Sequence, residues 1–292
     1  MRRLLLMAGL LWCVLCCCRA EGGWTEDGWA ALRADLASDT ALPVPAEHRI
    51  LPAPAPQVPE GQALTLLLMG TDAPDVKENF GRTDLLLLCR LDFEKGSIRL
   101  LSLPEEATVS LPSLPGRIML RHVNCFGGPL LTLQTVNGAL GVSASRYCAV
   151  NFAVFQDIVD ALGGVALNLT ESEALALGVP PGDRMLTGEE ALRYVRLRRQ
   201  GDGSGRAMAL LEAVANQLSR QEGIGNAYRL MDLMLPRLDT NLSTKNLMDA
   251  AVSFLGRNAA VDVSAWSLKS GPEGNLGDGG RCLEFLNGAW DP

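Results

Sequence analysis

The sequence predicts a three-layer α/β/α domain with a mixed central sheet, preceded by an export segment and a proline-rich linker. From about residue 63 onward, apolar stretches of strand length alternate with stretches of helix length, which is the pattern of an α/β domain. The strand-like stretches are apolar on both faces, as in strands covered by helices on both sides. With 292 residues, 48% of them hydrophobic, the chain is long enough for one large domain or two small ones.

The N-terminal residues 1–20 predict a signal peptide or signal anchor. Arg2 and Arg3 precede an apolar stretch that runs from Leu4 to Cys18, and a positive start before an apolar stretch is typical of a secretory signal. As a helix this stretch spans about 22 Å, short of a ~30 Å hydrocarbon core, so cleavage after Ala20 is favoured. We therefore expect residues 2 and 3 on the cytoplasmic side of the membrane and the folded domain on its outer side. The alternative is the buried first helix of a cytosolic protein.

Residues 21–62 are expected to form an N-terminal segment and linker. A short helical pattern runs from Trp24 to Leu36, and prolines follow at 43, 45, 52, 54, 56 and 59. This density of prolines disfavours helix and sheet and predicts an extended linker. The folded domain is therefore expected over residues 63–256, with residues 257–292 as a C-terminal tail.

Within the domain the elements follow one another with clear boundaries. Gly96 marks a turn, Pro129 suits the first turn of a helix and Gly141 ends it. Thr187 and Glu190 form the pattern of a capping box, so a helix begins there. Strands are expected at 64–69, 85–91, 98–103, 147–150 and 165–169, and further helices at 129–140, 152–162, 206–221, 225–235 and 244–256.

The composition disfavours two classes of function. The net charge is −7, the sequence pI is about 5.0, and 5% of residues are aromatic. Nucleic-acid binding usually requires a basic face or stacking aromatics, so no nucleic-acid partner is expected. Four cysteines lie beyond the export segment without the spacing of a zinc site. They either pair as disulfides or are small buried hydrophobes; they are Cys89, Cys125, Cys148 and Cys282.

Charged residues stand where two neighbouring strands end. Asp72 follows the strand at 64–69 and Asp84 precedes the strand at 85–91, so we expect both at one edge of the sheet. Two carboxylates there suit Mg²⁺, which prefers a few carboxylates together with substrate phosphates. Arg82 lies between them and suits a phosphate oxygen. Solvated turn residues are the alternative interpretation.

A second charged segment is rich in arginine. Arg196 and Arg198 are two positions apart, and such residues share a face in extended chain but not in a helix. The preceding helix is therefore expected to end near Arg196. The arginines either cap this helix or, with Arg199 and Arg206 close by, form an anion site. A last polar segment, from Asp239 to Ser243, reads as a loop with a helix N-cap.

Taken in order, these segments resemble the LytR–CpsA–Psr family from about residue 64 to 256. The matching blocks are LLLMGTD, GRTDLLLL, IRLLSLP, FGGPLLTLQTVNGALGV, YCAVNFAVFQDIVDALGGVALNL, LTGEEALRYVRLRR, GSGR and DTNLS. The resemblance implies a transferase that moves a glycopolymer from a polyprenyl-diphosphate carrier to peptidoglycan, outside a bacterial membrane and with Mg²⁺. The family is also named as a transcriptional attenuator, but the acidic balance and the export segment speak against contact with DNA.

The resemblance also implies roles for individual residues. Asp72, Arg82 and Asp84 match the family's catalytic motif, with Asp72 and Asp84 as metal ligands. Arg82 and the three arginines Arg196, Arg198 and Arg206 match the positions that hold the diphosphate. A polyprenyl tail requires a long apolar groove, which we expect between the sheet and the helices at 129–140 and 152–162.

Two departures from the family pattern favour an alternative. Glu105 stands where the family has the arginine of a Pro-Arg-Asp sequence, and Leu210 and Leu211 lie where it has an Arg-Gln pair. A glutamate beside a diphosphate is repulsive, and Arg117 and Arg121 are the candidates for a compensating charge. The alternative is a member that binds polyprenyl-diphosphate lipids without turnover.

Overall fold

The computed structural model describes residues 44, 49–55, 63–75, 78–111, 114–197, 203–220, 235–243, 245–246 and 262–289. The predicted export segment, most of the helices expected at 225–235 and 244–256, and Arg198 lie outside these residues. Within the described part of the chain, no helix combines the length and the apolar character that a membrane span requires.

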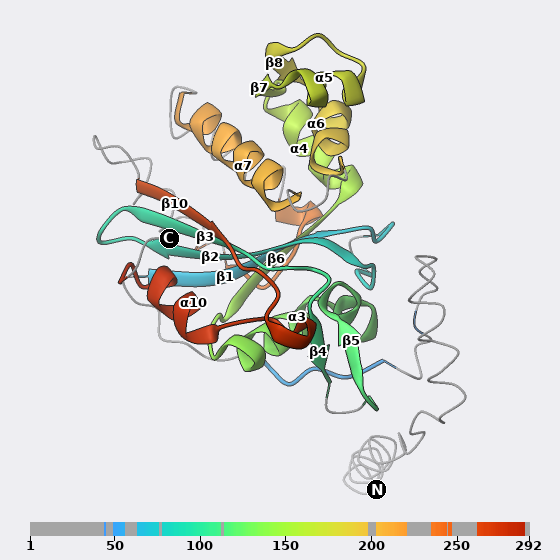
Figure 1. Cartoon of the computed structure of the whole chain (residues 1–292), viewed down its shortest axis with the longest axis vertical. Coiled ribbons are helices and arrows are strands. Elements are labelled where there is room, and N and C mark those ends of the chain that lie inside the picture. Colours follow the sequence, from blue (N-terminus) through green and yellow to red (C-terminus); the bar gives the residue numbers. More distant parts are fainter. Residues whose placement is uncertain are drawn as a thin grey trace, which may run out of the picture.

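A six-stranded mixed sheet forms the centre of the molecule (Figure 1). Its order is β10-β3-β2-β1-β6-β9. The β1–β2, β2–β3 and β6–β9 pairs are antiparallel, whereas β1–β6 and β10–β3 are parallel. The two leucine-rich strands β1 and β2 are therefore central, as predicted. The strands are β1 (Ala63–Thr71), β2 (Thr83–Asp92), β3 (Ser97–Ser102), β6 (Arg146–Asn151), β9 (Asp239–Thr240) and β10 (Asp262–Ser267).

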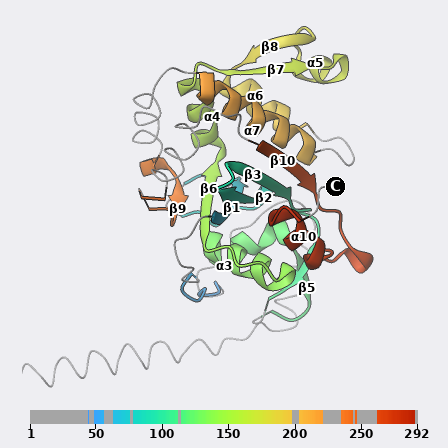
Figure 2. The ribbon, with the colours of Figure 1, turned by 90° about the vertical axis from the view of Figure 1, so that its left-hand side faces the viewer.

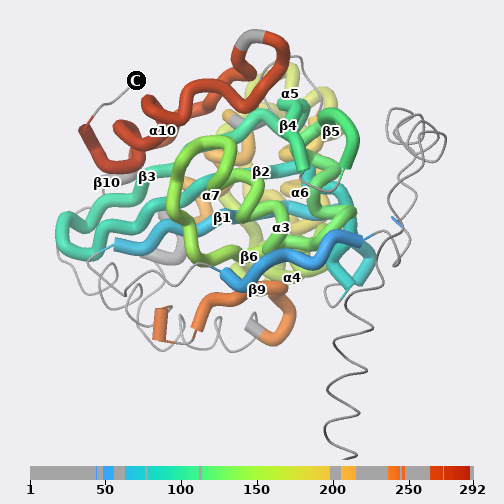
Figure 3. Tube along the Cα trace, turned by 90° about the horizontal axis from the view of Figure 1, so that it is seen from below, coloured from blue at the N-terminus to red at the C-terminus, as the bar shows by residue number. Residues whose placement is uncertain are grey.

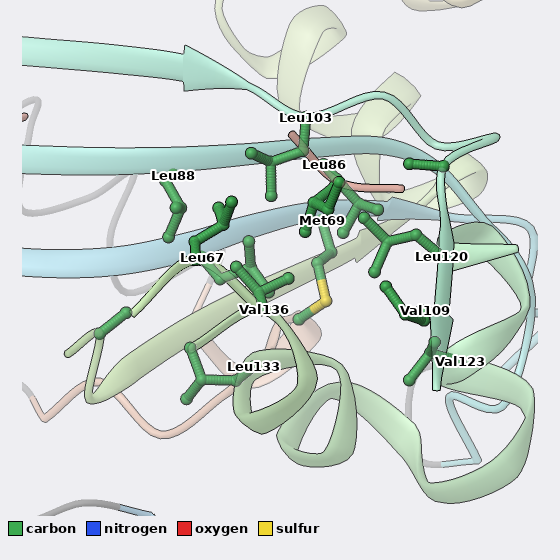
Figure 4. Packing of buried hydrophobic residues seen from close by; sticks show 14 of the residues in the cluster. Leu67, Met69, Leu86, Leu88, Leu103, Val109, Leu120, Val123, Leu133 and Val136 are labelled. Atoms are coloured by element: carbon green, nitrogen blue, oxygen red, sulfur yellow. The ribbon is translucent and has the colours of Figure 1, made fainter. Parts of the chain in front are cut away.

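Helices cover both faces of this sheet, which confirms the three-layer prediction (Figure 2). Helices α3 (Val123–Leu140) and α10 (Gly279–Leu286) cover one face, and α7 (Gly203–Arg220) covers the other. On the α3 face, Leu133 and Val136 are fully buried against Leu67 and Leu88 (Figure 4). Among the described residues, this face is a packed core, so the lipid groove expected beneath residues 129–140 is not found there.

The opposite face, beneath α7, is less completely covered. Its centre consists of Leu66, Cys89, Leu100 and Cys148. Other apolar side chains around this centre remain partly exposed; they are Leu64, Leu68, Leu91, Ile98, Val150, Met208, Leu211, Leu238 and Leu242. This face therefore carries the apolar surface that a lipid requires.

Helix α7 also packs against an outer unit with its own core. The unit contains α4 (Phe152–Ala161), β7 (Val165–Leu169), α5 (Glu171–Leu177), β8 (Gly182–Leu186) and α6 (Gly188–Val195). The predicted capping box is confirmed, because the Thr187 side chain accepts from the backbone N–H of Glu190 and the Glu190 carboxylate accepts from that of Thr187. Leu210 stands where the family pattern has one residue of its Arg-Gln pair. It is 3% exposed and packs within this core.

Several segments differ from the sequence predictions or add to them. The expected tail contributes β10 to the sheet and α10 to the core, because Cys282 and Phe285 are fully buried there. Helix α3 includes an additional helical segment from Val123, but Gly127 and Gly128 are not helical and Gly128 has a φ of 70°, so the helix predicted from Pro129 to Leu140 is present after this kink.

Part of the predicted linker also packs on the core. Val44 is 1% exposed, and the Ile50 N–H donates to the Phe126 carbonyl over 2.7 Å. Figure 3 shows the blue segment around residues 49–55 running beside α3. A short hairpin, absent from the prediction, joins β3 to α3; it comprises β4 (Thr108–Ser110), β5 (Arg117–Met119) and the 3-10 turn η2 (Leu120–His122).

The four described cysteines are free and buried. Burial raises the pKa of the Cys89 and Cys148 thiols to about 12, so both are protonated at neutral pH. The interpretation as small buried hydrophobes therefore holds for these residues.

Candidate functional site

The predicted site residues meet where three neighbouring strands have their ends. Thr71 at the end of β1 is paired with Thr83 at the start of β2 and with Asn151 at the end of β6. The Asp72 N–H donates to the Arg82 carbonyl over 3.0 Å. Asp72, Arg82 and Asp84 therefore share one end of the sheet, as the sequence predicts.

Asp72 and Arg82 are joined by one ion pair and one hydrogen bond from the Arg82 backbone. The Arg82 backbone N–H donates to Asp72 Oδ1 over 2.6 Å, and Arg82 Nε donates to Asp72 Oδ2 over 2.8 Å. The loop between them is held by Asn124 of α3, whose Nδ2 donates to the carbonyls of Asn79 and Gly81 over 3.0 and 2.7 Å. The Arg82 guanidinium is therefore fixed in direction before any ligand binds.

Gly81 makes this loop possible. A Cβ at this position would lie 2.3 Å from the Ala73 backbone N and 2.6 Å from Asp72 Oδ1. We expect Gly81→Ala to lower the free energy of unfolding by about 1–3 kcal/mol, because backbone must move to admit the methyl group. Gly138→Ala is the control. That exposed glycine inside α3 has no neighbour near its Cβ, so the same change should stabilise by about 0.5–1 kcal/mol. Urea unfolding measures both, and equal effects would contradict the close approach.

Asp84 is paired with an arginine that the sequence analysis named only as a candidate for compensation. Arg121 Nη2 in η2 donates to Asp84 Oδ1 over 2.8 Å. Arg117, the other candidate, is exposed and instead donates to Thr108, with Nε 2.9 Å from the hydroxyl and Nη2 2.7 Å from the carbonyl. The structure therefore separates the two candidates and brings Arg121 to the site.

Arg196 reaches the same end of the sheet from α6. The helix ends at Val195 with Arg196 as its C-cap, as predicted. The Arg196 guanidinium lies over the Phe152 ring, 4.6 Å from its centroid. Phe152 directly follows Asn151, which is paired with Thr71.

Arg206 has a supporting position. It is 4% exposed on α7, and its Nη2 donates to the carbonyl of Leu197. This contact fixes the chain directly after Arg196.

Asp239 of β9 contacts Tyr147 of β6 and Asn79 of the loop before Arg82, contacts that the sequence analysis missed. Its Oδ1 accepts from the Tyr147 hydroxyl over 3.2 Å. Burial raises the pKa of Asp239, although hydrogen bonds from Asn79 and Tyr147 act to lower it. Burial and the Asp239 charge raise the pKa of Tyr147 to about 12. The pattern DTNLS carries no sign of this contact, because it depends on the pairing of β9 with β6.

Buried polar atoms without partners gather around this end of the sheet. Buried polar groups in folded proteins are usually hydrogen-bonded. Among the described residues, six buried side-chain atoms lack a partner, and five of these belong to the site or its supports: Thr71 Oγ1, Asn79 Oδ1, Arg121 Nε, Asn124 Oδ1 and Arg206 Nε. Such a concentration suits a site that is completed by a ligand, an ion or water.

The carboxylates fit Mg²⁺ only in partnership with a ligand. No group of three or more potential metal-binding side chains occurs among the described residues. Both Asp72 oxygens accept from Arg82, which leaves Asp84 as the better metal ligand. Mg²⁺ commonly binds one or two carboxylates with phosphates and water in its remaining positions. The residues therefore fit a metal that is shared with a bound phosphate.

A separate cavity of about 560 Å³ lies beside β10 and includes Trp266, Lys269 and Arg281. It is not lined by Asp72, Arg82 or Asp84. The candidate site is therefore defined by the contacts of these three residues, and this cavity is not part of it.

Comparison with known proteins gives consistent matches. The model of the LytR_cpsA_psr family matches residues 46–277. The polyisoprenyl-teichoic acid–peptidoglycan teichoic acid transferase TagU of Oceanobacillus iheyensis is 28% identical over 245 residues, which cover 79% of this chain and 71% of that protein. TagU of Bacillus subtilis is 26% identical over 200 residues, covering 66% of this chain and 64% of that protein.

Solved structures agree on the fold. Bacillus subtilis TagV superposes with a TM-score of 0.63 at 22% identity, covering 78% of this chain and 95% of that one. YwtF (TagT) with bound octaprenyl pyrophosphate lipid superposes with a TM-score of 0.60 at 23% identity, covering 80% and 91%. At these identities the likeness supports the fold alone.

Proposed function

Because this chain belongs to the LytR–CpsA–Psr family, we propose that it transfers a glycopolymer from a polyprenyl-diphosphate carrier to peptidoglycan. The observation that carries the proposal is the gathering of Asp72, Arg82, Asp84 and Arg196 at one end of the sheet. The reaction takes place on the outer side of a bacterial membrane, to which the N-terminal segment directs the chain. The partners are the lipid-linked glycan, the peptidoglycan acceptor and the membrane, and no nucleic acid is involved.

The chemistry is a phosphoryl transfer. An acceptor hydroxyl oxygen forms a bond to the phosphorus that carries the glycan, and the bond from that phosphorus to the bridging oxygen breaks. Polyprenyl monophosphate leaves, and the acceptor hydroxyl loses its proton. Catalysis of such steps consists mainly of positioning and of neutralising the phosphate charge.

The residues divide these tasks. Arg82 and Arg196 bind the phosphate oxygens, together with Arg198 of the segment outside the described residues. Asp72 positions Arg82, since both of its oxygens accept from that residue. Asp84 would hold Mg²⁺, which supplies positive charge to the phosphate oxygens when bound. Arg206 supports the segment that carries Arg196 and Arg198.

The lipid tail lies on the sheet face beneath α7 in this proposal. The partly exposed apolar side chains on that face support this placement. The opposite face is filled by the core under α3.

A second candidate is a protein that binds the lipid without turnover. The negative charge at Glu105 and the core position of Leu210 favour it, because neither residue serves the phosphate as the family's arginine and polar pair do.

One experiment separates the candidates. The full chain in detergent is incubated with Mg²⁺, a farnesyl-diphosphate-linked glycan and peptidoglycan, and farnesyl monophosphate is measured. Release that requires the acceptor supports the transferase, and release without acceptor indicates hydrolysis. Binding without release supports the second candidate. A chain that neither binds nor cleaves the diphosphate contradicts the proposed function.

A further inference from the structure

Arg121 occupies a position fixed by its own backbone. It lies in η2, between the β4–β5 hairpin and α3. Its N–H donates to the Glu105 carbonyl over 2.9 Å, and its carbonyl accepts from the Thr83 hydroxyl over 3.4 Å. Thr83 stands between Arg82 and Asp84 in the sequence. The backbone of Arg121 is therefore hydrogen-bonded to Thr83 at the start of β2 on one side and to Glu105 on the other.

The side chain of Arg121 is buried and incompletely paired. Only 9% of it is exposed, and its one recorded ion pair joins Nη2 to Asp84. Its Nε is buried and lacks a partner among the described residues. A guanidinium has five N–H donors, and withdrawing it from water is costly unless they are used. One carboxylate contact leaves part of this donor capacity unmet, so the site favours a further anionic partner.

Residues 105 and 121 are direct neighbours with opposite charges. The hydrogen bond between their backbones places an arginine at 121 beside the position where the sequence carries a glutamate. The hairpin β4–β5 brings them together, because β4 follows Glu105 and β5 precedes Arg121. The backbone of Arg121 therefore lies directly beside position 105, where the family pattern has its arginine.

We propose that Arg121 is a diphosphate-binding residue of this chain, which supplies from η2 the cation that position 105 lacks. It pairs with Asp84 in the free protein and donates its unmet N–H groups to a diphosphate oxygen in the complex. This inference rests on the proposed function, and it deepens that function by naming a residue that contacts the substrate.

The test is a calorimetric titration of the full chain in detergent with farnesyl diphosphate, first in EDTA and then with Mg²⁺. Arg121→Gln should weaken binding by about ten- to a hundredfold in both conditions, as the loss of a charge-assisted hydrogen bond predicts. Arg121→Lys should recover part of the loss, because it restores the charge without the fork. Arg117→Gln is the matched control, since Arg117 lies four positions away and binds Thr108; it should bind within about twofold of the unaltered chain.

A second variant guards against a merely structural effect. In the double variant Glu105→Arg with Arg121→Gln, the arginine returns to position 105, and diphosphate affinity should recover although the Asp84 ion pair is absent. Thermal unfolding shows whether each variant is folded.

Three results would overturn the inference. Binding of farnesyl diphosphate by Arg121→Gln as tight as that of the unaltered chain would show that Arg121 does not contact the diphosphate. Loss confined to Mg²⁺ would mean that Arg121 acts through a metal at Asp84, and a double variant as weak as Arg121→Gln would mean that the charge at 105 serves no phosphate. Failure of the unaltered chain to bind the diphosphate would remove the proposed function as well.

Discussion

Replacing Asp84 with Asn is expected to lower the rate of glycopolymer transfer by about a hundredfold or more, the scale found when a group that stabilises transition-state charge is removed. The amide keeps the shape of the side chain and can still accept from Arg121. It loses the negative charge that a divalent cation requires. The residual rate should therefore no longer increase when Mg²⁺ is added. Release of polyprenyl monophosphate, measured against Mg²⁺ concentration, tests both parts of this prediction.

Asp92→Asn provides the control on the same strand. Asp92 lies at the far end of β2, where its Oδ1 accepts from the N–H groups of Glu94 and Lys95. An amide oxygen can accept these bonds, so the rate should stay within about twofold of the unaltered chain. A rate for Asp84→Asn that equals this control would remove Asp84 from the catalytic site.

Replacing Arg82 with Ala should weaken binding of farnesyl diphosphate by about a hundredfold and lower the free energy of unfolding by about 2–3 kcal/mol. The affinity falls because a fixed guanidinium is lost from the phosphate site. The stability falls because the largely buried Asp72 carboxylate loses its charged partner, at the lower end of the cost of breaking a buried pair. The Arg82 and Asp72 side chains are 17% and 19% exposed, so water recovers part of this loss.

Arg82→Lys separates charge from geometry. The ammonium restores the charge, but it cannot reproduce the planar fork. Arg82→Lys should therefore bind farnesyl diphosphate with about a tenth of the affinity of the unaltered chain. Arg90→Lys is the control, since Arg90 lies on β2, the strand that directly follows Arg82, and donates to the Thr65 hydroxyl over 3.1 Å. Calorimetry and urea unfolding measure the two effects. Full affinity in Arg82→Lys would contradict a directional contact with the phosphate.

The parts of the fold that were predicted are those whose sequence signals are local. Leucine runs predicted β1 and β2, and Thr187 with Glu190 predicted the start of α6. Strand β10 was missed because its short, partly polar sequence DVSAWS becomes a strand only through pairing with β3. Hairpin β4–β5 was missed for a similar reason, since each of its strands has only three residues.

The same distinction holds for the site residues: local patterns predicted some of them, and contacts between distant segments bring in the others. Asp72 and Arg82 were predicted together because a strand end and a strand start ten positions apart meet in an antiparallel pair. The contact of Arg121 with Asp84 spans 37 positions and depends on η2, which no local pattern announces. Asp239 depends in the same way on the register of β9 with β6.

The late position of β10 has a consequence for how the chain is made. Asp262 pairs with Ser97, so the outer edge of β3 has no partner from its own sheet until the chain has been synthesised past residue 262. Pairings between segments so distant in sequence form slowly, because the loop between them must close first. During that interval β3 presents open backbone N–H and C=O groups to other nascent chains. Chain termination before residue 262 should thus yield aggregates rather than a shortened enzyme, since the uncovered edge belongs to β3, which is paired with β2.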